Sequence, residues 1–381
     1  MKKKRLVIFL ASLSILMCGS GTILAMTETS VTNTLSTGIV DIELEEYRIQ
    51  DGEEERYEDV KDILPGQVIS KIPRIRNAGN DCYIRAKLEL TGTEESIEIR
   101  EIGENWVQGK DGYLYYTEVL KTGEETDLFQ SIRIPEDFAQ AENSTFQLKI
   151  DAEGIQSKNF TPDFEADAPW GAVEIQQCKK EGQYDISSFK QASDQSLRVV
   201  YEGDSQKLFS EPEDFFTNFP VMLPGDAYEE TAVLQNTADK PVKLYFRGAS
   251  EETADNDLLE QIGLTITTEI AGKTETVYEG ALKGAGLEEN RLLGEIPAQS
   301  TGNFHFALEV PEELDNQYTV LTNQVVWAFS TEPLEPLTPV QTGDLRKTGI
   351  CLVVGGVLLG TGTLILRKRR TKDEESVADP L

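Results

Sequence analysis

The chain is predicted to be all-β, with two tandem antiparallel β-sandwich domains of the jelly-roll or immunoglobulin-like kind. Three observations predict this class. Short segments alternate apolar and polar residues with a period of two, long helical patterns between strands are absent, and turn markers recur in the same order in both halves. A length of 381 residues is enough for two such domains.

The first half contains the clearest strand patterns. Residues 40–44 alternate apolar and acidic side chains, which predicts a half-buried strand. A longer alternation over residues 82–90 predicts a second strand. The turn sequence at residues 111–112 lies between aromatic-rich segments and predicts a hairpin, and a later strand is expected at residues 146–150.

The alternation fades between residues 161 and 195, where prolines and polar residues predict a linker. It returns in the second half, where short helices are also expected at residues 213–219 and 256–262. The strands expected there lie at residues 197–200, 242–246, 264–266, 304–308 and 325–329.

The two halves share a series of sequence markers in the same order. Each half has a Leu-Pro-Gly turn, then an asparagine at the same distance before an alternating strand, and later an apolar residue followed by Pro-Glu. The matching positions are Leu64-Pro65-Gly66 with Leu223-Pro224-Gly225, Asn77 with Asn236, and Ile134-Pro135-Glu136 with Val310-Pro311-Glu312. This order predicts two copies of one domain.

These patterns divide the chain into seven parts. They are a signal peptide (1–25), β-sandwich domain 1 (30–160), a linker (161–195), β-sandwich domain 2 (196–332), a proline-rich stalk with a sorting motif (333–344), a transmembrane helix (348–366) and a cytoplasmic tail (367–381).

The N-terminus has the pattern of a secretory signal peptide. A basic start is followed by an apolar run over residues 6–17 and then by small residues, so signal peptidase is expected to cleave near Ala25. Cys18 lies in a lipobox-like context, which leaves lipoprotein processing as the alternative.

The C-terminus resembles a sortase sorting signal of a Gram-positive surface protein. The motif Pro339-Val340-Gln341-Thr342-Gly343 is a degenerate form of LPxTG, and an apolar span and four basic residues follow it. The resemblance implies that a sortase cysteine attacks Thr342, that the bond to Gly343 breaks, and that peptidoglycan accepts the acyl group. The protein is therefore expected on the extracellular face, anchored in the wall or membrane, with its C-terminus cytoplasmic before sorting. An ordinary membrane anchor is the alternative.

Composition argues against several functions. The net charge is −31 and the acidic residues are spread along the chain, so no nucleic-acid partner is expected. The one histidine, His305, alternates with phenylalanines and is expected to face outward. One histidine cannot supply the usual zinc-hydrolase ligands or a nucleophile system, so no enzyme activity, metal or cofactor is expected. Ser187 and Lys190 match a Ser-x-x-Lys motif, which we attribute to coincidence.

Two cysteines lie between the terminal segments, Cys82 and Cys178. Cys82 falls on an apolar strand face and is expected to be a buried thiol, with a disulfide between the two as the alternative. Lys–Asn isopeptide bonds occur in some sandwich domains of wall proteins. Asn77 and Asn236 are candidates by residue type alone, although asparagine is also favoured in turns for local reasons.

The first half is similar to the TasA/camelysin family of bacterial surface proteins. The similarity covers residues 31–160 and is fainter over residues 196–332. It is carried by Val31-Thr32-Asn33-Thr34, Gly38, Val40-Asp41-Ile42, Pro65-Gly66, Asn77-Ala78-Gly79, Tyr83-Ile84-Arg85, Trp106, Asp111-Gly112-Tyr113, Tyr115-Tyr116, Gly123-Glu124, Leu128-Phe129 and Ile155-Gln156. The resemblance implies a jelly-roll sandwich, a role in surface fibres or biofilm matrix, and TasA-like fibre subunits as partners.

The sequence as a whole predicts a non-enzymatic, wall-anchored surface protein that anchors fibres or contacts the matrix. A ligand-binding adhesin is the alternative, and a metal-dependent peptidase is a third reading that the histidine count opposes. In the resembling family an N-terminal segment can complete the sheet of a neighbouring subunit. Residues 31–45 are therefore either exchanged in this way or paired within their own domain.

Overall fold

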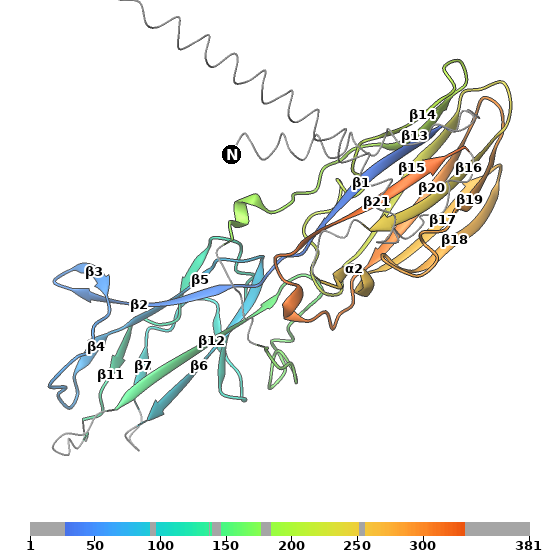
Figure 1. Cartoon of the computed structure of the whole chain (residues 1–381). Helices are drawn as coiled ribbons and strands as arrows, with labels where there is room; N and C mark the ends of the chain where they lie inside the picture. Colours follow the sequence, from blue (N-terminus) through green and yellow to red (C-terminus); the bar gives the residue numbers. More distant parts are fainter. Residues whose placement is uncertain are drawn as a thin grey trace, which may run out of the picture. The chain divides into compact units, whose positions relative to one another are not determined.

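The structure is a computed structural model that describes residues 27–91, 97–136, 138, 146–176, 184–250 and 256–331. Within these residues the chain is all-β, as predicted, and its strands form five sheets (Figure 1). Neighbouring strands are antiparallel except β13 and β15, which are parallel. The short helices are η2 (Ile186–Ser188), α2 (Leu258–Gln261) and η3 (Asn316–Tyr318).

The first lobe is built from β2 to β12. Its sheets have the strand orders β10-β5-β2-β3, β4-β11-β7 and β12-β6-β9-β8. The strands are β2 (Ile42–Gln50), β3 (Glu53–Arg56), β4 (Val68–Ser70), β5 (Ile72–Asn77), β6 (Cys82–Thr91), β7 (Glu98–Arg100), β8 (Trp106–Gln108), β9 (Tyr113–Tyr116), β10 (Glu125–Asp127), β11 (Ser131–Arg133) and β12 (Gln147–Gln156). Apolar side chains from all three sheets form one core between them.

The second lobe is built from β1 and from β13 to β21. One sheet has the order β14-β13-β15-β20-β17-β18 and the other has the order β1-β21-β16-β19. The strands are β1 (Glu28–Ser36), β13 (Leu197–Glu202), β14 (Lys207–Glu211), β15 (Ala227–Asn236), β16 (Val242–Ser250), β17 (Gly263–Ile270), β18 (Lys273–Ala281), β19 (Arg291–Ile296), β20 (Ser300–Glu309) and β21 (Thr322–Ser330).

Aromatic rings join the two sheets of the second lobe. Phe306 and Trp327 lie in opposite sheets with ring centroids 5.0 Å apart, and Phe246 and Phe304 are 5.3 Å apart. These separations are typical of favourable edge or tilted ring pairs. The alternation predicted for residues 304–308 and 325–329 therefore supplies the inner face of each sheet.

The N-terminal strand β1 belongs to the second lobe. It pairs with the last strand, β21, along its whole length, from Glu28 opposite Ser330 to Ser36 opposite Thr322 (Figure 1). Val31 and Leu35 point into the second core, each 1% exposed. This differs from the predicted domain 1, which placed residues 30–36 with the strands that follow them. The period of two indicates which face of a strand is apolar but not which sheet the strand joins.

The strand predicted at residues 40–44 is present as the start of β2. Ile42 and Leu44 are partly buried and pack against the first core. Glu43 and Glu45 lie opposite Arg76 and Arg74 of β5. β2 pairs within the first lobe, as one of the two alternatives expected, whereas β1 pairs with β21 of the second lobe, which neither alternative gave.

The predicted linker is packed at both of its described ends. Trp170 is 3% exposed, lies 5.8 Å from the ring of Tyr115 and takes the guanidinium of Arg85 over its face at 4.6 Å. At the other end Ser193 donates its N–H to Thr217 O, which ties the segment to the second lobe. The segment thus contributes to both lobes, although its residues 177–183 lie outside the described part.

The short helix predicted at residues 256–262 is present as α2, but residues 213–219 form turns instead. Phe215 and Phe216 in that stretch are fully buried. Their side chains fill the second core, so tertiary packing decides the local conformation there.

The sequence markers of the two halves occupy matching positions. Gly66 N–H bonds to Ile134 O at 3.1 Å, and Gly225 N–H bonds to Val310 O at 3.1 Å. In both lobes the glycine of the Leu-Pro-Gly turn therefore donates a hydrogen bond to the apolar residue before the Pro-Glu pair. This residue directly follows β11 in the first lobe and β20 in the second. The central pairings also match, because β6 pairs with β12 and β9 as β16 pairs with β21 and β19. The two lobes therefore share these turn bonds and this order of central strands.

All described residues fall within one compact unit. The signal peptide (1–25), the stalk and sorting motif (333–344), the transmembrane helix (348–366) and the tail (367–381) lie outside the described residues. Within the described part, no helix has the length and apolar character needed to cross a bilayer.

Replacing Leu35 by alanine is expected to destabilise the second lobe by about 2–5 kcal/mol, because a buried leucine is removed from its core. The measurement is denaturant unfolding followed by the fluorescence of Trp327 after Trp106 and Trp170 are changed to phenylalanine. Leu44→Ala in the first lobe is the matched control and should leave this transition unchanged. A Trp327 unfolding transition that is unchanged in Leu35→Ala would contradict the placement of β1 in the second lobe.

Candidate functional site

The two lobes meet where the chain crosses from β1 to β2, at residues 37–41. Thr37 bonds to the second lobe, because its N–H donates to Leu321 O and its hydroxyl donates to Tyr318 O. Ile39 bonds to the first lobe, because its N–H donates to Asn80 Oδ1 at 2.8 Å. One short connection therefore carries backbone contacts to both lobes.

Two glycines allow the connection to pass this closely. A Cβ on Gly38 would lie 2.3 Å from Asn80 Oδ1 and 3.0 Å from the side chain of Leu223. A Cβ on Gly79 would lie 2.5 Å from Ile39 O. Because no side chain can occupy these spaces, glycine at both positions is required by the junction.

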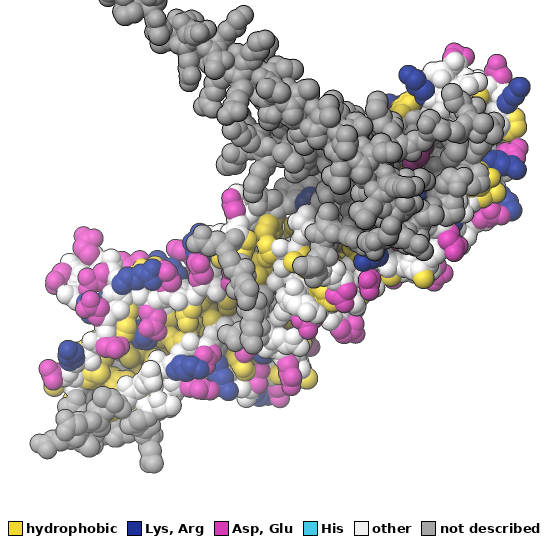
Figure 2. All heavy atoms as spheres, viewed as in Figure 1, with side chains coloured by type: hydrophobic (Ala, Val, Ile, Leu, Met, Phe, Trp, Pro, Cys, Tyr) yellow, Lys and Arg dark blue, Asp and Glu magenta, His cyan; other side chains and the backbone are white. Residues whose placement is uncertain are grey.

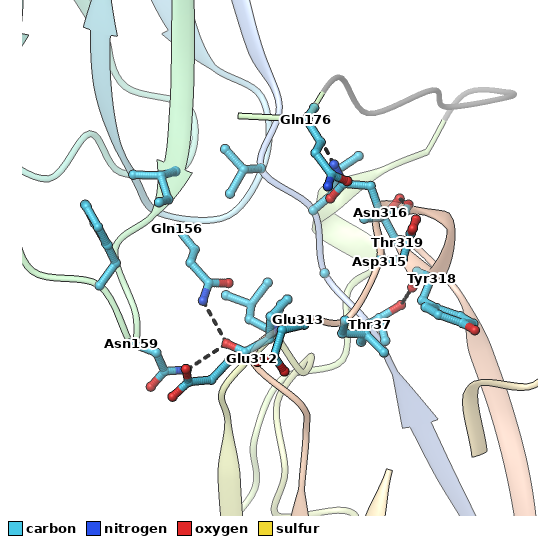
Figure 3. Close-up of a pocket in the computed structure, with 18 of the residues that line it drawn as sticks. Thr37, Gln156, Asn159, Gln176, Glu312, Glu313, Asp315, Asn316, Tyr318 and Thr319 are labelled. Atoms are coloured by element: carbon cyan, nitrogen blue, oxygen red, sulfur yellow. Dashed lines mark hydrogen bonds between the residues drawn. The ribbon is translucent and has the colours of Figure 1, made fainter. Parts of the chain in front are cut away.

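A second set of contacts joins the end of β12 to the Leu-Pro-Gly turn of the second lobe. Gln156 Nε2 donates to Pro224 O at 2.7 Å, and Asn159 Nδ2 donates to the same oxygen at 3.1 Å (Figure 3). Asn159 Nδ2 also lies 2.7 Å from Asp226 Oδ1. The turn is therefore held by side chains from the first lobe.

Asp226 is the most enclosed charged group of this junction, with a side chain that is 0% exposed. Its carboxylate accepts from Leu223 N–H at 2.9 Å and from the Tyr228 hydroxyl at 2.6 Å, and Lys158 Nζ lies 2.8 Å away. Burial, together with the hydrogen bond to Asp226, raises the pKa of Tyr228. The carboxylate is thus fully partnered, as a buried charge must be.

A groove opens beside this junction (Figure 3). Its volume is about 560 Å³, and its walls come from the crossover, the end of β12, residues 173–176, the Leu-Pro-Gly turn and the loop that contains η3. The described lining includes four carboxylates and no lysine or arginine. The carboxylates belong to Glu174, Glu312, Glu313 and Asp315. The groove is therefore acidic, and Figure 2 shows further Asp and Glu side chains, with Lys and Arg among them, spread over the described surface.

The two lobes differ in what covers the last strand of each. In the second lobe β21 pairs with β16 on one side and with β1 on the other. In the first lobe the matching strand, β12, pairs with β6 and is otherwise an edge among the described strands (Figure 1). The turns differ in the same way, since Leu223 is 8% exposed while Leu64 is 65% exposed. Among the described residues, the first lobe thus has a less paired counterpart of β21 and a more exposed counterpart of the Leu-Pro-Gly turn.

The predicted processing sites lie outside the described residues. These sites are Ala25 for signal cleavage, Pro339, Val340 and Gln341 in the sorting motif, and Thr342 and Gly343 at the scissile bond.

Among the described residues no catalytic arrangement forms. His305 faces outward on β20, with Nδ1 2.7 Å from the Thr231 hydroxyl and Nε2 4.0 Å from Glu269. Ser187 and Lys190 do not act together, because the serine hydroxyl donates to Asp185 while the lysine amine donates to backbone carbonyls. The described part of the chain contains no group of three or more metal-ligating side chains.

Asn77 and Asn236 have structural roles at matching turns. Asn77 Nδ2 donates to Leu120 O at 2.8 Å and to Asn80 O at 3.0 Å, and Asn236 Nδ2 donates to Ile296 O at 3.1 Å. Both side-chain oxygens accept the N–H of the residue two positions later. Their amides are fully engaged with the backbone, which favours the turn interpretation over a cross-link.

Cys82 is a buried free thiol, as expected from its strand face. Burial raises its pKa to about 12, so the unreactive thiol form dominates at neutral pH. Cys178 lies outside the described residues. Trp106, Trp170 and Trp327 are buried, which fits packing roles.

The residues that form the junction were not found by sequence reasoning. Gln156, Lys158, Asn159 and Asp226 are ordinary polar residues at the ends of strands and turns. The only available signal was the Leu-Pro-Gly marker, which located the turn but not its partner in the other lobe.

No protein-family model and no curated protein matches the chain. Solved structures give only remote similarity. The crystal structure of Lac15 from a marine microbial metagenome is 10% identical, with a TM-score of 0.12, over 73% of this chain and 60% of that one. The VP2 subviral particle of infectious bursal disease virus is 10% identical, with a TM-score of 0.11, over 97% of this chain and 100% of that one. These values are too low to indicate a shared fold.

Asp226→Ala is expected to destabilise the second lobe by about 2 kcal/mol or more, because Leu223 N–H and the buried Tyr228 hydroxyl lose their acceptor. Lys158→Ala is also expected to be destabilising, because it leaves the buried Asp226 carboxylate without its cationic partner. A double-mutant cycle by denaturant unfolding measures both costs and the coupling between the two side chains. Additive costs would contradict a stabilising contact between Lys158 and Asp226.

Proposed function

We propose that the protein is a non-enzymatic surface protein, exported and anchored to the cell wall by a sortase, which holds a fibre or matrix component at the cell surface. In this proposal each lobe is a jelly-roll sandwich. The observation that carries the proposal is the difference between the lobes: β21 of the second lobe pairs with β1, whereas β12, the matching strand of the first lobe, pairs only with β6 among the described strands.

The contacts that β1 and the end of β12 make with the second lobe indicate how a partner would bind the first lobe. At the second lobe, an incoming strand pairs with β21, and side chains from the end of β12 bind the Leu-Pro-Gly turn. The first lobe offers β12 and the exposed turn at Leu64 in the corresponding places. A subunit that resembles the first lobe could therefore add its own N-terminal strand to β12. TasA-like fibre subunits are the partners proposed for this edge.

Strand addition is physically suited to such a joint. Backbone hydrogen bonds along an open edge give affinity, and alternate side chains set the register. β12 presents ten residues to β6, from Gln147 to Gln156, so its free side is as long as the edge that β1 covers on β21. Soluble proteins normally protect edges of this length, which supports a partner for β12.

Wall anchoring rests on the sequence at the C-terminus. β21 is the last described strand, and the chain continues from it into the proline-rich segment and the sorting motif. In this proposal the second lobe is the base that is attached to peptidoglycan, and the first lobe carries the free edge.

A ligand-binding adhesin is the second candidate function. The observation that favours it is the groove of about 560 Å³ beside the junction, a volume within the range of small-molecule sites. Its acidic lining would suit a cationic ligand.

Thr342→Ala is expected to abolish wall anchoring, because sortase forms its acyl intermediate on this residue. The protein should then stay in the membrane fraction and disappear from muramidase-released wall material. Thr338→Ala, just before the motif, is the matched control and should leave wall release intact. Unchanged wall release of the Thr342 variant would contradict sorting at this position.

Ala152→Pro is expected to block strand addition without breaking the first lobe. Ser157 N–H donates to Asp81 O, so by the alternation of antiparallel pairs the N–H of Ala152 points away from β6. Proline removes only this outward donor, which edge strands tolerate. The measurement is fluorescence anisotropy of a labelled peptide with the sequence of residues 27–41, titrated with the full chain.

We expect saturable binding to the wild-type chain and to Ala152→Val, which keeps the N–H, and at least tenfold weaker binding to Ala152→Pro. Thermal melting of each variant checks that the first lobe remains folded. Peptide binding that is equal in both variants would exclude the β12 edge as the acceptor.

A further inference from the structure

A buried amide lies beside β1 without a complete set of hydrogen bonds. Asn33 is 0% exposed, and its Oδ1 accepts the N–H of Phe215 at 2.8 Å. Its Nδ2 has no hydrogen-bond partner. A buried polar group left in this way costs about 1–3 kcal/mol, and most buried side-chain groups avoid it. The presence of asparagine at this buried position is therefore not explained by its contribution to the free energy of folding.

A partly buried amine lies next to the same two segments of chain. Lys190 Nζ donates to Thr34 O and to Phe216 O, both at 2.6 Å. Thr34 directly follows Asn33, and Phe216 directly follows Phe215. On β1 the amine therefore contacts the residue that follows Asn33. In the turn at residues 213–216 it contacts the residue that follows Phe215, which is bonded to Asn33.

The surroundings of Lys190 favour its reactive form. Its side chain is 17% exposed, and burial lowers the pKa of the amine, which increases the neutral fraction at a given pH. Asp214 Oδ2 lies 3.7 Å from Nζ. This carboxylate can accept a proton from the lysine, and its other oxygen is held by Phe216 N–H at 2.7 Å.

We propose that Lys190 and Asn33 form an isopeptide bond that fixes β1 to the second lobe. Lys190 Nζ attacks Asn33 Cγ, and the Phe215 N–H stabilises the charge that develops on Oδ1. The C–N bond to Nδ2 then breaks. Asp214 takes the proton released by the lysine and returns it to Nδ2, which leaves as ammonia. No oxidant or other reactant is needed, and the products are one secondary amide and one ammonia.

The bond would have a mechanical consequence. β1 is the strand through which the first lobe is attached to the sheet of the second, so an isopeptide at Asn33 would make that attachment covalent. This consequence deepens the proposed anchoring function, but the bond itself does not depend on wall sorting. Its test can therefore fail or succeed independently.

The experiment is mass spectrometry of the purified full chain and of Lys190→Arg. Arginine keeps the charge and donors but is not an amine nucleophile. Corrected for the substitution, the wild type should be about 17 Da lighter, the mass of one ammonia. Lys207→Arg, at an exposed lysine of the same lobe, is the matched control and should keep the mass loss. Tryptic digestion should give a branched peptide that joins residues 181–198, uncut at Lys190, to the N-terminal peptide that ends at Arg48.

Two results would overturn the proposal. One is a folded wild-type chain with its full sequence mass and normal tryptic cleavage at Lys190. The other is a mass loss that remains in Lys190→Arg, since this would indicate a cyclic imide formed by an asparagine alone. Neither result depends on wall release, so the anchoring function would be judged separately.

Discussion

The pairing of β1 with β21 is the interaction on which the rest of the arrangement depends. A strand at the start of the chain and a strand at its described end share one sheet, so the chain must leave the second lobe, build the whole first lobe and return. The crossover at residues 37–41 then has to pass between the lobes, and its glycines are dictated by the space left there. The end of β12 returns to the same place, where Gln156 and Asn159 bind the turn at Pro224.

The two lobes share their turn bonds but differ in what surrounds the Leu-Pro-Gly turn. The same glycine and asparagine bonds recur in each lobe. The asparagine bonds are local, because each side-chain oxygen accepts the N–H of the residue two positions later. The glycine bonds are long-range, since Gly66 N–H donates to Ile134 O and Gly225 N–H donates to Val310 O. The surroundings of the turn are not repeated. In the second lobe it is covered by the first lobe, and in the first lobe it is exposed. The asymmetry places the candidate binding edge on the first lobe alone.

Much of the fold could be predicted from the chain because alternation and turn chemistry are local. The strands at residues 40–44, 82–90 and 304–308, the buried thiol of Cys82 and the outward position of His305 all follow from the period of two. Residues 213–219 were predicted as a short helix but form turns. Phe215 and Phe216 in this stretch are buried in the second core, so tertiary packing decides the local conformation.

The sequence by itself determined the all-β class, the face that each strand buries and the repeat of the turn markers, since each of these depends on residues close together in the chain. Only the tertiary structure decided that β1 joins the second lobe, that β12 pairs only with β6 among the described strands, and that Lys190 bonds to the residue after Asn33 and lies near Asp214. The physical reason is that strand pairing is made by backbone groups, which every residue carries. Side-chain patterns fix the face of a strand, whereas the choice of partner depends on the closure of the whole sheet.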